Sequence, residues 1–186
     1  ASRIGPQPEV DAEKLALHGL SAGGSGNTLA GALDDRVRAT TLWFAAGHGA
    51  LGARTRPAWT AKLLASMSPP RGYDAPEWST HLRWFDPARH IAPDHPDTLL
   101  VAGAQDPFFP LDMTVATAAD LARAGVEHRL AVVVGFGHQP RPDVDAAAFV
   151  ERIRSTSAWW LRRRLFAPER LLPTVTATVA DGALVV

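Results

Sequence analysis

The stretch from residue 15 to residue 24, Leu-Ala-Leu-His-Gly-Leu-Ser-Ala-Gly-Gly, decides the fold of this chain. It places a Gly-x-Ser-x-Gly pattern directly after a short apolar run, Leu15–His18, and directly before a segment of small residues, Ala22–Leu33. An apolar run that stops at a glycine predicts a buried strand, and the small residues suit a tightly packed helix. The sequence therefore predicts a strand, a sharp turn at Ser21 and a helix in direct succession.

A serine on such a turn projects from the end of its strand, where it is exposed for chemistry. Side chains two positions before and after the serine would collide, so we expect both Gly19 and Gly23 to be required for steric reasons. The helix directs free N–H groups toward negative charge, which makes the Ala22 N–H a candidate oxyanion-hole donor. Leu20 is a candidate wall of a substrate pocket. The alternative is an ordinary Gly/Ser-rich turn, such as a phosphate-binding loop, although no Gly-Lys-Ser/Thr follows.

Three further apolar runs are candidate strands: Thr40–Phe44, Thr98–Ala102 and Leu130–Val134. They are continuously apolar rather than alternating, which is typical of parallel strands covered on both faces. The spacing of apolar residues predicts helices over Thr114–Ala124 and Val144–Leu165. Strands that alternate with helices predict an α/β protein with a mostly parallel sheet and flanking helices.

Two polar residues follow strand ends in an order that complements the serine. Asp106 comes just after the third strand and His138 just after the fourth. Because the carboxyl ends of parallel strands meet at one edge, we expect both to lie beside Ser21. The histidine would take the serine proton during attack on a carbonyl, and the aspartate would orient the imidazole. Asp112 is a rival acid, which we instead assign as the N-cap of a helix that ends at Gly125.

Several other residues are candidates for the site. Phe108 and Phe109 directly follow Asp106 and are candidate pocket walls. His48 follows the second strand and either lines the site or belongs to a flexible loop. His18 lies within the first strand, where we expect it in the core. No His-x-x-x-His spacing indicates a metal site, and serine chemistry of this kind needs no cofactor, so we expect neither.

The composition is that of an ordinary globular protein. The 186 residues carry 19 basic and 19 acidic side chains, so the formal net charge is zero, which argues against a broad electrostatic nucleic-acid binder. Cysteine is absent, which excludes disulfides, cysteine nucleophiles and thiolate metal sites but assigns no compartment. No run of about 18 apolar residues is present to span a membrane.

The long connection between the second and third strands is expected to be an excursion over the sheet. It covers about 45–96, contains three tryptophans and is a candidate lid. Apolar clumps such as Trp59–Met67 predict short helices within it. After the last helix, period-two alternation and an Asp-Gly turn predict a β-hairpin. We therefore divide the chain into a partial catalytic domain, 1–170, and a hairpin, 171–186, that would open a C-terminal β domain.

At these residues the chain resembles the α/β-hydrolase superfamily, over 10–166. The turn at 15–24 and the segment after the third strand resemble its prolyl-oligopeptidase and acetylxylan-esterase-like branches. The resemblance implies a serine hydrolase in which Ser21 is the nucleophile, Asp106 the acid and His138 the base. Its expected substrate is a small-molecule carboxylic ester, cleaved through an acyl-enzyme. The alternatives are a serine peptidase of prolyl-oligopeptidase type and a catalytically inactive domain used for binding.

One departure from the superfamily concerns the start of the fold. In that superfamily several strands and helices precede the serine turn, including the loop that supplies a second oxyanion-hole donor, whereas only 20 residues precede Ser21 here. The first strand would then be an exposed apolar edge, which proteins avoid. We therefore expect a fragment, or one chain of a two-chain protein, whose sheet is completed by an N-terminal segment or companion chain. Alone it is expected to be inactive, because losing one oxyanion donor costs about a hundred- to a thousandfold in rate.

Overall fold

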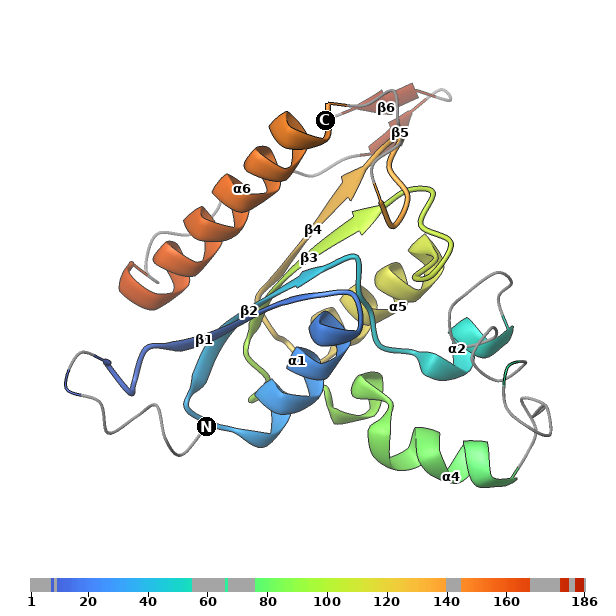
Figure 1. Cartoon of the computed structure of the whole chain (residues 1–186), viewed down its shortest axis with the longest axis horizontal. Helices are drawn as coiled ribbons and strands as arrows, with labels where there is room; N and C mark the ends of the chain where they lie inside the picture. The colour runs from blue at the N-terminus through green and yellow to red at the C-terminus, as the bar shows by residue number, and fades with distance from the viewer. Residues whose placement is uncertain are drawn as a thin grey trace.

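The computed structural model of the chain describes residues 8, 10–54, 66, 76–139, 145–167, 178–180 and 183–185. Within them, a four-stranded sheet runs in the order β1-β2-β3-β4, and every neighbouring pair is parallel (Figure 1). The strands are β1 (Leu15–Leu20), β2 (Val37–Trp43), β3 (Asp97–Gly103) and β4 (His128–Val133). The predicted parallel α/β sheet is confirmed.

Helices cover both faces of this sheet. Figure 1 shows the long helix α6 (Ala146–Phe166) on one side of the sheet, with α1 (Ala22–Leu33) and α5 (Leu111–Arg123) on the other. The connection from β2 to β3 contains α2 (Gly49–Arg54), α4 (Pro76–Phe85) and a 3-10 helix, η1 (Pro87–His90). Each strand is thus joined to the next by helical crossovers, as parallel pairing requires.

The two faces carry separate apolar clusters because successive strand residues point to opposite sides. Trp43 of β2 packs against α6 beside Trp160, and its indole N–H donates a 2.8 Å hydrogen bond to Ser157 Oγ. The preceding residue, Leu42, packs on the opposite face against Leu121 of α5. Burial on both faces explains why apolar residues follow one another directly in the central strands, as Leu42 and Trp43 do in β2 and Leu99 to Ala102 do in β3.

The outer strand β1 is less buried than the central strands β2 and β3. His18, which was predicted to lie in the core, is exposed. Its Nδ1 lies 2.5 Å from Thr41 Oγ1, and its ring packs edge-on against Trp43. The prediction was wrong because β1 is paired on one side only, with β2, in the described sheet.

Two helices begin differently from the prediction. α5 begins at Leu111 with Pro110 in the N-cap position, so Asp112 lies in the first turn and is not the cap. The extended backbone of Pro110 starts the helix earlier than a cap at Asp112 would allow, and the carboxylate still lies near the positive end of the helix dipole. α6 begins at Ala146, and its N-cap is Asp145, whose side chain accepts two backbone N–H groups.

Part of the predicted organisation falls outside the described residues. The helices expected within Trp59–Met67 lie outside the described residues, apart from Ser66, which is helical. The lid over 45–96 therefore stays a prediction. Near the C-terminus, β5 (Thr178–Ala180) and β6 (Ala183–Val185) pair antiparallel. That they open a β domain also stays a prediction.

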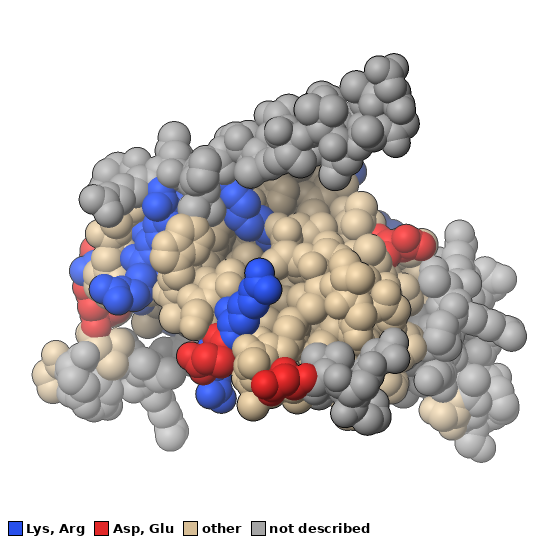
Figure 2. Space-filling view, turned by 90° about the horizontal axis from the view of Figure 1, so that it is seen from above, with Lys and Arg blue, Asp and Glu red and all other residues tan. Residues whose placement is uncertain are grey.

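The surface carries both signs of charge. On the face seen in Figure 2, acidic and basic side chains both occur, and neutral residues cover most of its described part. Among the helices that the structure describes, none is long and apolar enough to cross a membrane.

Candidate active site

Ser21 occupies a strained turn between β1 and α1. Its backbone angles are φ 57° and ψ −130°, a region that residues other than glycine rarely adopt. Three backbone hydrogen bonds hold the turn: Ser21 N–H donates to the Trp43 carbonyl at 2.8 Å, and the N–H groups of Gly24 and Ser25 donate to the Ser21 carbonyl. Ala22 is the first residue of α1, so its N–H is one of those that a helix leaves unpaired at its start.

The glycines around this turn are not equivalent. A Cβ atom on Gly19 would lie 2.5 Å from Asn27 Nδ2 and 2.6 Å from the Gly23 carbonyl, so the steric prediction is correct for Gly19. It is wrong for Gly23, where an added Cβ meets no described atom within 4 Å outside its own stretch of helix. The second crowded position is Gly24, whose Cβ would lie 2.5 Å from the Ala45 Cβ. The crowding arises because this face of α1 packs on the end of β2, a contact that the local motif does not reveal.

The structure brings together the three polar residues that follow strand ends. Ser21 Oγ lies 2.9 Å from His138 Nε2, and His138 Nδ1 lies 2.9 Å from Asp106 Oδ2. The Asp106 side chain is fully buried. Its other oxygen, Oδ1, accepts the backbone N–H groups of Phe108 at 2.7 Å and Phe109 at 3.0 Å. The carboxylate is thereby fixed on both sides, which selects the imidazole tautomer with its proton on Nδ1 and leaves Nε2 to accept from the serine.

The loops that carry Asp106 and His138 touch through their backbones. Gln105 N–H donates to the Phe136 carbonyl at 3.0 Å. A Cβ atom on Gly103, the last residue of β3, would lie only 2.5 Å from the Gly137 carbonyl oxygen. Gly103 therefore permits the close approach that joins acid to base, and sequence reasoning missed it. The available signal was a glycine at the end of a strand, just before the acidic residue.

Aromatic rings surround the His138 imidazole. The ring centroid of Phe108 lies 4.9 Å from it, that of Phe109 5.8 Å and that of Phe44 6.2 Å. Phe109 is buried, whereas Phe108 is 36% exposed and Leu20, beside the serine, is 55% exposed. Phe44 was not predicted for the site; it follows β2 with a positive φ of 48°, a conformation that sequence alone does not signal.

His48 contacts a helix rather than the residues around Ser21 and His138. Its Nε2 is 2.6 Å from Asp120 Oδ2 on α5, so the residue ties the turn after β2 to that helix. Its positive φ of 60° places it in the same strained turn region as Phe44. This pair does not belong to a larger cluster of ligands: in the described part of the chain, no group of three or more His, Asp or Glu side chains is arranged to hold a metal ion.

A helix-flanked parallel sheet with Ser, Asp and His at its carboxyl edge defines an α/β-hydrolase. Residues 4–163 match the prolyl oligopeptidase family, so the chain belongs to this family of serine hydrolases. No curated protein matches the chain in sequence.

Solved structures share the fold. A puromycin-hydrolyzing peptidase of Mycobacterium tuberculosis matches 84% of this chain with a TM-score of 0.70 and 23% identity. Acetyl xylan esterase 1 of Thermoanaerobacterium matches 89% with a TM-score of 0.64 and 18% identity. The acylaminoacyl peptidase of Pyrococcus horikoshii matches 91% with a TM-score of 0.72 and 17% identity. The chain spans only 23%, 50% and 27% of these three proteins respectively.

Proposed function

We propose that this chain carries the catalytic residues of a serine esterase that works through an acyl-enzyme. The observation that carries the proposal is the continuous chain of hydrogen bonds from Ser21 through His138 to Asp106. Each residue has the environment its role needs: a serine on a strained turn, a histidine that contacts both partners, and a buried carboxylate with fixed orientation.

The reaction takes place in two acyl transfers. Ser21 Oγ attacks the ester carbonyl while His138 Nε2 removes its proton, and the Ala22 N–H stabilises the oxyanion. The imidazolium, stabilised by Asp106, then gives its proton to the departing alkoxide, so an alcohol leaves and the acyl group stays on Ser21. Water repeats the sequence with His138 as base, which releases the carboxylic acid and restores the serine.

The surroundings of the triad support an ester over a peptide substrate. The rings that contact His138 in the described structure, Phe44, Phe108 and Phe109, offer apolar surface to an acyl or alcohol group. A peptidase would also need a pocket for a peptide amine or a proline ring. The related structures include both esterases and peptidases, so a peptidase of prolyl-oligopeptidase type is the second candidate. An inactive binding domain is the third candidate.

We further propose that an N-terminal segment or companion chain completes the sheet along β1. In the described sheet β1 pairs only with β2, which leaves its other side without a partner strand. The added segment would supply the second oxyanion-hole donor, so we expect full activity only with it.

A fluorescent fluorophosphonate tests the proposal, because it reacts with activated serines. The natural protein and this chain are treated with the probe, and the label is located by peptide mass spectrometry. We expect label on Ser21 that disappears in Ser21→Ala and weakens in His138→Ala, whereas Ser155→Ala, a change at an exposed serine of α6, leaves it unchanged. Label on the natural protein but not on this chain supports the added segment. No label on either eliminates the hydrolase and favours the binding domain.

A further inference from the structure

A pocket lies between α6 and the neighbouring strands β3 and β4, on the face of the sheet that α6 covers. Its volume is about 440 Å³. Its strand wall is formed by Val101 and residues 131–134, and its helix wall by Phe149, Arg152, Ile153 and Thr156. A pocket of this size is within the range of about 300–1,000 Å³ that is usual for small-molecule sites.

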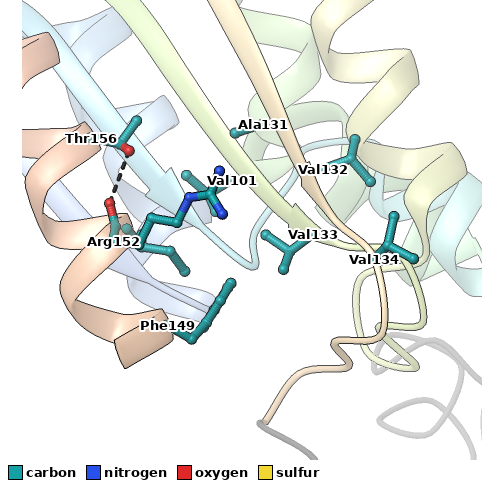
Figure 3. Close-up of a pocket in the computed structure, with 9 residues that line it drawn as sticks. Val101, Ala131, Val132, Val133, Val134, Phe149, Arg152 and Thr156 are labelled. Atoms are coloured by element: carbon teal, nitrogen blue, oxygen red, sulfur yellow. Dashed lines mark hydrogen bonds between the residues drawn. The ribbon is translucent and has the colours of Figure 1, made fainter. Parts of the chain in front are cut away.

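The lining is mixed: valine and phenylalanine side chains lie beside the polar Arg152 and Thr156, and Arg152 is exposed to solvent. Figure 3 shows the Arg152 side chain reaching from α6 toward the strands, with its guanidinium beside Val101. Within the described residues, no carboxylate forms an ion pair with Arg152. The Thr156 hydroxyl donates to the Arg152 carbonyl at 2.9 Å, which leaves the guanidinium as the charged donor of the pocket. An unpaired guanidinium beside apolar walls suits an anion with an apolar body.

We infer that this pocket binds a small carboxylic acid with an apolar tail. A guanidinium binds a carboxylate through two parallel hydrogen bonds, and the side chains of Val101, Val133 and Phe149 would cover part of the tail. A cavity of about 150 Å³ is enough for benzene, so this pocket accommodates a tail of about eight carbons. Figure 3 shows Val133 and Phe149 converging on the same space as the guanidinium, which places tail and carboxylate in one molecule.

The pocket is separate from the triad. The Phe149 ring stacks on Phe136 at 4.0 Å, Phe136 stacks on Phe44 at 5.3 Å, and Phe44 contacts the His138 ring at 6.2 Å. This series of aromatic rings lies between the pocket lining and the imidazole. The inference therefore does not depend on the proposed hydrolysis and holds for an inactive domain as well.

Octanoate is the probe, and the full chain is titrated by calorimetry and NMR. We expect saturable one-to-one binding that weakens about tenfold to a hundredfold in Arg152→Gln, because charge-assisted hydrogen bonds are lost. Arg152→Lys, which keeps the charge but not the planar fork, gives an intermediate affinity. Arg154→Gln, on the same helix but outside the lining, leaves the affinity unchanged. Octanamide, with the same tail and no charge, binds wild type as weakly as octanoate binds Arg152→Gln.

The position of the probe is read separately. Intermolecular NOEs from the octanoate chain to the methyl groups of Val101 and Val133 place it in the pocket, in wild type and in Ser21→Ala alike. The inference is overturned if octanoate shows no saturable binding, if Arg152→Gln and Arg154→Gln have equal effects, or if the NOEs go to Leu20 beside the serine instead.

Discussion

The two edges of the parallel sheet are built from different interactions. At the carboxyl edge, the backbone is strained and crowded. In the described chain, the non-glycine residues with a positive φ all follow β1 or β2; they are Ser21, Phe44 and His48. At the amino edge, the contacts are ion pairs between side chains. Arg164 binds Asp97 at the start of β3, and Arg36 binds Asp34 just before β2.

This difference indicates at which edge of the sheet substitutions should have the larger effects. A strained backbone persists only where the surrounding structure determines it, and such positions cluster at functional sites. Ion pairs that solvent still reaches, such as that of Arg36 and Asp34, contribute little. Substitutions at the carboxyl edge should therefore have large effects on chemistry or stability, and those at the amino edge small ones.

The largest effect is expected from Asp106→Asn at the carboxyl edge. The amide keeps the shape of the carboxylate but loses its charge and favours the wrong imidazole tautomer, so kcat should fall about 10⁴-fold. The measurement is steady-state hydrolysis of p-nitrophenyl acetate by the natural protein. Because Asn still accepts the N–H groups of Phe108 and Phe109 through its carbonyl, the denaturation midpoint should change little. A loss of less than tenfold would assign the acid to another residue.

Two glycines of the same edge should differ in how much stability the protein loses when each is replaced by alanine. Gly19→Ala forces a Cβ against the Gly23 backbone and should destabilise the protein by about 1–3 kcal/mol, as overpacking does. The added Cβ of Gly23→Ala meets no described atom outside its own stretch of α1, so the change should be neutral or stabilise by about 0.5–1 kcal/mol. Urea denaturation of the full chain compares them. Equal destabilisation by both would contradict the open space beside Gly23.

The comparison also shows what sequence reasoning reaches. Strand ends are marked by local patterns, so the positions of Ser21, Asp106 and His138 at one edge followed from the order of apolar runs. The roles of Gly24 and Gly103 did not, because each depends on a backbone neighbour that is distant in sequence. The exposure of His18 was missed for a related reason: a strand's partners, and not its own residues, decide how far it is buried.

At the amino edge, the His95 side chain is buried and is held by backbone carbonyls rather than by an ion pair. Its Nδ1 lies 3.0 Å from the Pro96 carbonyl and its Nε2 3.2 Å from the Thr28 carbonyl, and burial lowers the pKa of the imidazole despite these acceptors. Below its unfolded pKa of about 6.5, the unfolded state binds a proton that the folded state does not. The contribution of neutral His95 to the free energy of unfolding should therefore be complete above this pH. Below it, the free energy of unfolding should fall by at most about 1.4 kcal/mol per pH unit.

Urea denaturation between pH 5.5 and 7.5 measures this slope. Desolvation also lowers the pKa of His18, so both histidines contribute in the same direction. His95→Gln should flatten the pH dependence more than His18→Gln, because His95 is buried and His18 is exposed. An unchanged slope in His95→Gln would mean that this imidazole is already charged in the folded protein.

The smallest effect is expected at the ion pair of Arg36 and Asp34. The hydrogen bonds from the Arg36 guanidinium lower the pKa of the Asp34 carboxyl to about 2. In Arg36→Gln this pKa should rise toward its ordinary value of 3.8, which NMR titration of the carboxyl carbon detects. The denaturation midpoint at neutral pH should not move measurably, because the pair is close to solvent and salt screens it. If Arg36→Gln destabilised the protein as much as Gly19→Ala, the amino edge would be as demanding as the carboxyl edge, and the contrast between them would fail.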